Sequence, residues 1–259
     1  MAELGGKTAI ISGGLGDIGL AMVKSLSSAG AVVAIGDLHS PERADILFKS
    51  MAIDSSLLRY DQVDVSDAAA VERWVANVES DVATPQLVIP NAAVVTPVDI
   101  LSITSVEWAR EMQINLNGAF HVAQLAARRI VAAKLPGRIV FVGSWAAHSP
   151  HTNIPAYCVS KAGLRMLTQL FALRLARHDI LVNEIAPGLV DAGLSGRAFE
   201  QDSDLRVRAQ SWVPVQKLIK PEEVAQQVLH LCDPANQHVT GSTLLMDGGL
   251  SMTRASHAG

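Results

Sequence analysis

Residues Thr8–Gly19 read Thr-Ala-Ile-Ile-Ser-Gly-Gly-Leu-Gly-Asp-Ile-Gly, an apolar run that passes at once into a glycine-rich turn. A helical pattern of apolar residues, Ile18–Ala29, continues directly from this turn. Glycines are needed where a backbone turns tightly against a ligand, and a helix N-terminus offers free N–H groups to phosphate. Glycines also serve ordinary turns, so the strand–turn–helix context carries the argument. The stretch predicts the first βα unit of a dinucleotide-binding sheet, with these cofactor residues: Ser12, Gly13, Gly14, Gly16, Asp17, Ile18 and Gly19.

The same alternation of short β-branched runs and longer amphipathic stretches continues along the chain, as parallel strands joined by crossover helices require. The expected strands are Thr8–Ile11, Val32–Ile35, Leu57–Val63, Leu87–Ile89, Arg138–Val142, Leu181–Ile185 and Thr243–Met246. The expected helices are Ile18–Ala29, Ala68–Val78, Val106–Ala133, Ala156–Arg177 and Glu222–Leu231. We predict an α/β fold: one doubly wound Rossmann domain over residues 1–259, with a seven-stranded parallel sheet and helices on both faces.

Composition sets limits on partners and location. The chain has 259 residues, 49% hydrophobic, with a net charge of -4 and a pI near 6.0, which favours neither nucleic acid nor an anionic membrane. Cys158 and Cys232 form no Cys/His cluster, so we expect reduced thiols, no metal and a cytoplasmic protein. The sequence contains neither a secretory leader pattern nor an apolar run long enough to span a membrane.

An acidic residue closes the second expected strand. Asp37 lies a little over twenty residues beyond the glycines, where a carboxylate can bind the adenosine ribose hydroxyls and repel a 2′-phosphate. Neither Arg nor Lys follows at once, since the next residues are Leu38, His39 and Ser40. NAD is therefore favoured over NADP, although an Asp here can also simply cap a turn.

The expected helix Ala156–Arg177 carries Tyr157-Cys158-Val159-Ser160-Lys161, and Ser144 stands thirteen residues before the tyrosine. Tyr157 and Lys161 are four residues apart, so both project from one helix face. A free phenol has a pKa of about 10 and is a poor base at neutral pH unless a nearby positive charge stabilises the phenolate. Lys161 can supply that charge.

Taken together, these motifs resemble the short-chain dehydrogenase/reductase family from Lys7 to Gly249. Besides Ser144 and Tyr-x-x-x-Lys, the matching motifs are Asp64-Val65, Asn91-Ala92, Asn115, Pro187-Gly188, Thr240-Gly241 and Asp247-Gly248-Gly249. The resemblance implies that Tyr157 is the acid/base and that Ser144 holds the substrate oxygen. It also implies that Lys161 lowers the tyrosine pKa and binds the nicotinamide ribose, and that Asn115 positions a water leading to solvent. The further cofactor residues that it implies are Asp37, Leu38, Asp64, Val65, Asn91, Ala92, Ala93, Pro187, Gly188 and Val190.

Four positions depart from the family's pattern. Asp17 stands where a glycine is usual; we expect it either to crowd the pyrophosphate or to act as the N-cap of a helix starting at Ile18. Pro90 and Ala93 replace Asn and Gly around Asn91, which predicts a changed loop geometry. Ala192 replaces a threonine that grips the carboxamide, a role that Ser195 is placed to take over.

The segment between Ser144 and Tyr157 should form a wall of the substrate pocket, and the expected substrate contacts are Ser144, Trp145, His148, His151, Tyr157 and Leu189. Its histidines suit a polar substrate, although loop histidines are often merely solvated. A secondary alcohol of a sugar, polyol or hydroxylated ring, oxidised to a ketone or lactone, is the leading hypothesis.

Two alternatives stay open: a 3-oxoacyl thioester reductase and a catalytically silent NAD-binding regulator. The cofactor half is expected over residues 1–150, the catalytic half over 140–259 and a lid over 191–220. The resemblance further implies a homotetramer.

Overall fold

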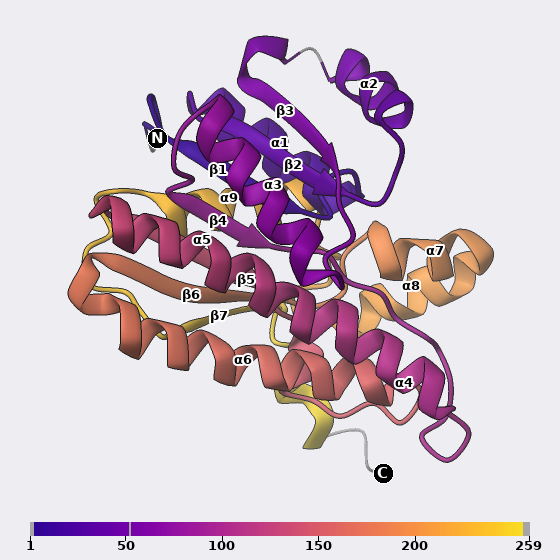
Figure 1. Ribbon diagram of the computed structural model, residues 1–259. Helices are drawn as coiled ribbons and strands as arrows, with labels where there is room; N and C mark the ends of the chain where they lie inside the picture. The colour runs from indigo at the N-terminus through magenta and orange to yellow at the C-terminus, as the bar shows by residue number, and fades with distance from the viewer. Residues whose placement is uncertain (1–2, 52, 256–259) are drawn as a thin grey trace.

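The architecture is a seven-stranded parallel sheet of strand order β3-β2-β1-β4-β5-β6-β7 (Figure 1). The computed structural model describes residues 3–51 and 53–255. The chain builds the sheet outward from β1, first to β3 and then from β4 to β7, which is the doubly wound arrangement that the sequence predicts. The strands are β1 Thr8–Ser12, β2 Val32–Asp37, β3 Leu58–Gln62, β4 Leu87–Pro90, β5 Gly137–Val142, β6 Ile180–Pro187 and β7 Thr243–Met246.

Helices cover both faces of the sheet and bury two separate apolar cores (Figure 1). One core joins β-strand side chains to α1 Asp17–Ser28, α2 Pro41–Ser50 and α9 Pro221–Cys232. The other lies beneath α3 Ala68–Asp81, α5 Ala119–Ala133 and α6 Pro155–Leu175. The inner strands β1, β4, β5 and β6 are buried throughout, because a parallel sheet covered on both faces leaves no strand face to water.

All seven expected strands are confirmed to within a few residues, but three helical regions differ from the prediction. The helix α2 was not expected, because its single buried residue, Ala44, gives almost no apolar periodicity. The segment expected to be a lid, residues 191–220, contains two helices, α7 Gly193–Gln201 and α8 Ser203–Trp212. Among the described residues no helix is long and apolar enough to cross a membrane.

The long helix expected over Val106–Ala133 is not uniform. It consists of α4 Ser105–Met112, a π-helical segment Gln113–Gly118 and α5. Single π turns inside α-helices are rare and often occur at functional sites. This one contains Asn115.

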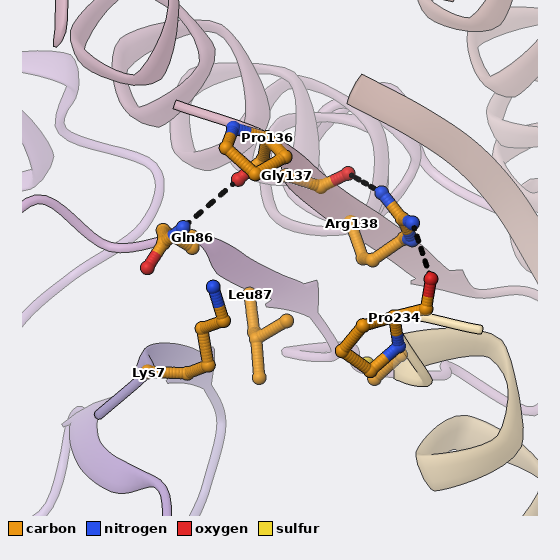
Figure 2. A pocket seen from close by; sticks show the side chains of 8 residues that line it. Lys7, Gln86, Leu87, Pro136, Gly137, Arg138 and Pro234 are labelled. Atoms are coloured by element: carbon orange, nitrogen blue, oxygen red, sulfur yellow. Dashed lines mark hydrogen bonds between the residues drawn. The ribbon is translucent and has the colours of Figure 1, made fainter. Parts of the chain in front are cut away.

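The two edges of the sheet differ in character. At the amino edge, a cavity of about 40 Å³ lies at the starts of β4 and β5 (Figure 2). Arg138 there donates to the carbonyls of Gly137 at 2.8 Å and Asn236 at 2.9 Å, so it joins β5 to the segment after α9. The residues singled out by the sequence lie instead at the carboxyl edge, where ligands of doubly wound folds bind.

Candidate active site

The glycine-rich turn lies directly against the loop that follows β4. Gly13 has φ +65, and a Cβ on it would lie 2.7 Å from the Cα of Ala92, so only glycine fits this approach. Asn91 donates through Nδ2 to the carbonyl of Gly13 at 2.8 Å, and its N–H donates to Ser12 Oγ at 3.1 Å. The two expected cofactor segments therefore form one rigid unit.

The start of α1 is suited to a phosphate. Gly16 is the N-cap and no side chain caps the helix, so the first N–H groups of α1 remain available to an anion. Gly14 and Gly19 fit closely against Ile35 and Gly13, and a Cβ on either would lie within 2.6 Å of a neighbouring atom. The residues present thus fit a dinucleotide pyrophosphate.

Asp17 does not play the N-cap role that the sequence suggested. It is the first residue of α1, and its Oδ2 accepts a hydrogen bond from the N–H of Gly193 at 2.7 Å. The N-cap prediction is wrong because Gly16, with extended backbone angles, already occupies that position. The carboxylate instead joins the glycine-rich turn to the start of α7.

Asp37 closes β2 and is nearly buried. Its Oδ2 accepts from the N–H of Leu15 at 3.0 Å, and its Oδ1 lies 2.7 Å from Nδ1 of His39. The carboxylate therefore caps the glycine-rich turn and also presents a negative charge at the end of the strand. Both sequence interpretations of this residue, cap and acidic recognition group, are compatible with one side chain. Leu38, which follows it, is exposed.

The segment after β3 forms a tight turn next to the π-helical segment. Asp64 Oδ1 accepts from both the N–H and the hydroxyl of Ser66, at 2.8 and 2.7 Å. Val65 is buried against Gly118, where a Cβ would lie 2.6 Å from Val65 Cγ2. The loop after β4 has no positive φ at Ala93, so the alanine that replaces glycine there is unstrained.

Ser144, Tyr157 and Lys161 converge beyond the end of β5. Ser144 caps the 3₁₀ turn Trp145–Ala147, and its hydroxyl is also a hydrogen-bond partner of the Tyr157 phenol. Lys161 lies one helical turn from Tyr157, with Nζ 5.6 Å from the centre of the phenol ring. Nζ donates to the carbonyl of Val142 at 2.7 Å. The chain brings together a proton-bearing phenol, a hydroxyl and an ammonium, as expected.

Burial shapes the acidity of this group. It raises the pKa of Tyr157 to about 12, against the lowering effect of Ser144, and Cys158 and Glu111 raise it further. Burial lowers the pKa of Lys161 to about 8, and Glu184 opposes this shift. A phenol with so high a pKa can act as a base near neutral pH only where a positive charge stabilises its phenolate.

Asn115 holds the active-site loop from within the π-helical segment. Its Nδ2 donates to the carbonyl of Val94 at 2.8 Å and to Ser160 Oγ at 3.2 Å, and its Oδ1 accepts from the N–H of Val94 at 2.8 Å. Asn115 is therefore a buried bridge between the loop after β4 and the helix of Tyr157, and not a helix amide facing solvent.

The segment after β6 begins at the site and leads into the two helices α7 and α8. Gly188 donates to the carbonyl of Met246 at 2.8 Å, and a Cβ on it would lie 2.8 Å from the Cα of Asp247. Val190 is buried and forms a parallel bridge with Ile219, which closes the base of the segment. The neighbouring Leu189 accepts from the Ile219 N–H at 3.0 Å. Ser195 lies in the first turn of α7.

The expected substrate wall has two parts. Trp145 and His151 pack edge to face, with ring centres 4.5 Å apart. His148 Nδ1 lies 3.5 Å from a guanidinium nitrogen of Arg165. Burial lowers the pKa of His148, and the charge of Arg165 lowers it further. At neutral pH His148 is therefore an uncharged group.

Sequence reasoning missed two buried glutamates beside the site. Glu111 lies on α4 and accepts from the N–H of Thr96 at 2.6 Å, while Glu184 lies on β6 and accepts from Thr243 Oγ1 at 2.6 Å. Each also has a buried oxygen without a hydrogen-bond partner among the described residues. A signal existed for Glu184, a charged residue within the apolar run Ile180–Pro187. Glu111 resembles a surface charge on an amphipathic helix.

A family model described as enoyl-(acyl carrier protein) reductase matches residues 14–251. The chain is 30% identical over 254 residues to a 2,3-dihydro-2,3-dihydroxybenzoate dehydrogenase of Bacillus subtilis (strain 168), covering 95% of this chain and 97% of that protein. The chain belongs to the short-chain dehydrogenase/reductase family. It is also 32% identical to human L-xylulose reductase, over 95% of this chain and 97% of that protein.

Solved structures agree with this assignment. A short-chain type dehydrogenase/reductase from Mycobacterium marinum superimposes with a TM-score of 0.87 at 28% identity, covering 96% of each chain. Membership of this short-chain dehydrogenase/reductase family makes the chain an oxidoreductase acting on alcohol or carbonyl groups with a nicotinamide cofactor. The free α1 N-terminus and the close-packed glycines fit such a cofactor.

Proposed function

We propose that this protein is an NAD-dependent dehydrogenase that interconverts a secondary alcohol and a ketone, or a lactol and a lactone, on a sugar, polyol or hydroxylated ring. The observation that carries the proposal is the convergence of the buried Ser144 and Lys161 on the half-buried Tyr157 at the carboxyl edge of the sheet. The named activities of the relatives, on a dihydroxylated ring and on L-xylulose, support a hydroxylated substrate.

In the oxidative direction, Tyr157 would take the proton of the substrate hydroxyl. Ser144 donates to the substrate oxygen, and Lys161 supplies the positive charge that makes the phenolate accessible. Asn115 fixes the loop after β4 relative to α6, the helix that carries Tyr157. When bound, NAD supplies the hydride acceptor; the chain supplies orientation and proton management.

Cofactor choice rests on Asp37. Its carboxylate is fixed by the Leu15 N–H, so it cannot easily turn away from an incoming 2′-phosphate, and the like charges repel. We propose that Asp64-Val65 flank the adenine and that Asn91, Ala92 and Ala93 line the adenosine ribose. Pro187-Gly188 and Val190 would hold the nicotinamide, and residues 191–220 would serve as the lid.

Substrate contacts are proposed for Trp145, His148, His151 and Leu189, of which His148 is uncharged at neutral pH. An uncharged His148 suits a neutral polyol better than an anionic substrate. The 3-oxoacyl thioester reductase remains a second candidate, because the matching family model carries the description of an acyl carrier protein reductase. Turnover of acetoacetyl thioesters with NADPH, exceeding that of any alcohol with NAD, would favour it.

We also propose a cytoplasmic homo-oligomer, a tetramer by family expectation. Val159, Met166, Leu170 and Leu173 of α6 are exposed and follow one another at spacings of seven, four and three, so they form one apolar stripe on the helix. Among the described residues Cys158 and Cys232 form no disulfide, which suits a reducing compartment. Light scattering on wild type and Leu170→Glu tests the assembly.

The experiment that tests the proposed function uses NAD and NADP separately with a panel of sugars, polyols, cyclic alcohols and hydroxy acids, monitored by absorbance of the reduced nicotinamide. We expect turnover with NAD that Tyr157→Phe loses by at least about a hundredfold, the scale of a lost acid/base group. NAD binding without turnover on the whole panel would support the silent regulator instead.

A further inference from the structure

Glu184 is a buried carboxyl group that the proposed chemistry does not use. It lies on β6, fully buried, with β5 on one side and β7 on the other. Its Oε2 accepts from Thr243 Oγ1 at 2.6 Å, and its Oε1 has no hydrogen-bond partner among the described residues. A buried carboxyl with an unpaired oxygen is costly to stability, so its presence requires a reason.

Its place relative to the catalytic residues supplies one. The carbonyl of Val142 holds Lys161 Nζ at 2.7 Å, and the next residue, Gly143, makes room for Glu184. A Cβ on Gly143 would lie only 1.8 Å from Glu184 Oε1. The residue after that is Ser144. Three consecutive positions at the end of β5 thus organise the ammonium, the carboxyl and the hydroxyl.

The groups that face Glu184 come from every element packed on it. Burial has the largest effect on the Glu184 pKa and raises it. The hydrogen bond with Thr243 on β7 lowers that pKa, and so do the charges of Lys161 and Arg165 on α6. In return, Glu184 raises the pKa of Lys161, whose burial acts in the opposite direction. The negative groups that bear on the Tyr157 phenol are Cys158 and Glu111. Glu184 is not one of these groups, whereas Lys161 lies one helical turn from Tyr157 with Nζ 5.6 Å from the ring centre, so the effect of Glu184 on Tyr157 that we infer is indirect and passes through Lys161.

We infer that Glu184 is a positioning residue: its buried carboxylate holds Lys161 as an ammonium at the end of β5 and so sets the pH at which Tyr157 accepts the substrate's proton. The inference rests on the proposed function, in which Tyr157 is the acid/base. It adds a group on β6 to the chemistry assigned to α6.

The first test needs no substrate. The chain has seven lysines, so 1H–13C spectra of protein labelled with [ε-13C]lysine contain few lysine signals to separate. The Lys161 signal is the one that disappears in Lys161→Met. We expect a Lys161 midpoint near 8 in the wild type and a midpoint lower by about one unit in Glu184→Gln, the scale of one charge at short range. Glu184→Asp keeps the charge and should lower the Lys161 midpoint by less than about half a unit. An unchanged Lys161 midpoint in folded Glu184→Gln would overturn the inference.

The second test uses activity and compares two glutamates that act on different parts of the pH profile. Glu184→Gln lowers the pH at which Lys161 loses its proton, so with the panel alcohol of highest kcat/KM the loss of kcat/KM should be about twofold at pH 7 and grow to roughly tenfold well above pH 8. Glu111→Gln removes a carboxyl that raises the Tyr157 pKa, so the acid limb of the same profile should move to lower pH. A structural role for both glutamates predicts losses that do not depend on pH, and a Glu184→Gln loss that does not grow with pH would count against the inference.

Thr243→Val covers the case in which Glu184→Gln does not fold. It keeps the carboxyl but removes the hydrogen bond that lowers its pKa, so the Lys161 midpoint should fall by a smaller amount. If no alcohol is oxidised, the proposed function fails while the Lys161 titration still decides the role of Glu184.

Discussion

Asp17 accepts a hydrogen bond from the backbone N–H of Gly193 at 2.7 Å, across 176 positions of the chain. The contact ties the first residue of α1 to the first residue of α7, so the turn proposed to hold the pyrophosphate also anchors the proposed lid. A residue that looked like an obstacle to the cofactor is thereby part of the link between two ligand-binding segments.

This contact predicts the behaviour of two variants. Asp17→Ala removes the acceptor, and an exposed charged hydrogen bond contributes about 0.5–1 kcal/mol, so the Gly193 amide should exchange roughly two- to fivefold faster. Asp17→Asn keeps an acceptor oxygen and should exchange almost as the wild type does. Hydrogen exchange of Gly193 measures both. Equal protection in wild type and Asp17→Ala would show that the contact does not restrain α7.

The close approach of Gly13 to Ala92 predicts a graded loss of stability. Gly13 and Gly6 both have positive φ, but a Cβ on Gly6 meets nothing within 4 Å. Gly6→Ala should cost about 1 kcal/mol from the backbone conformation alone. Gly13→Ala adds the collision with Ala92 and should cost roughly 2–4 kcal/mol. Denaturant unfolding compares the two; equal losses would contradict the packing argument.

The double role of Asp37 can be separated by substitution. Asp37→Asn keeps an oxygen for the Leu15 N–H but removes the charge, so the preference for NAD over NADP should fall by about ten- to a hundredfold with little change in stability. Asp37→Ala removes both and should lower the melting temperature as well. Steady-state kinetics with each cofactor and thermal unfolding give the answer. Strict use of NADP by the wild type would refute the role assigned to the charge.

Burial of Lys161 predicts a pH-dependent stability. Its pKa is about 8 in the folded protein, below the ordinary lysine value of 10.5, so between these values the unfolded chain binds the extra proton. Raising the pH through this window therefore favours the folded state. Relative to Lys161→Met, the free energy of unfolding of the wild type should rise by up to about 3 kcal/mol from pH 8 to 10.5. A pH-independent difference between the two proteins would indicate an ordinary lysine.

The sequence predicts the sheet well because both faces of it are covered, and such strands read as continuous apolar runs bounded by turns. It predicts the catalytic group because Tyr157 and Lys161 are local on one helix and Ser144 ends a strand. It fails where the answer depends on distant segments. The partner of Asp17 lies on α7, and Gly16 rather than Asp17 takes the cap.

Helices with little apolar contrast also escaped prediction. In α2 only Ala44 is buried, and α7 and α8 are short and rich in polar residues. The sequence indicates only part of the role of Glu184. A charged residue inside an apolar strand signals a special site, but it does not reveal that Gly143 and Thr243 lie against it.

The π-helical segment around Asn115 has a consequence for how this chain tolerates changes in length. Each residue of an α-helix advances the side chains by about 100°, so the wide turn sets the rotational phase of everything after it. Deleting one residue between Gln113 and Gly118 would either pull Asn115 off Val94 and Ser160 or rotate the alanine-rich face of α5 away from the sheet. Surface loops elsewhere can gain or lose residues, whereas here a single deletion would force a choice between the active site and the core.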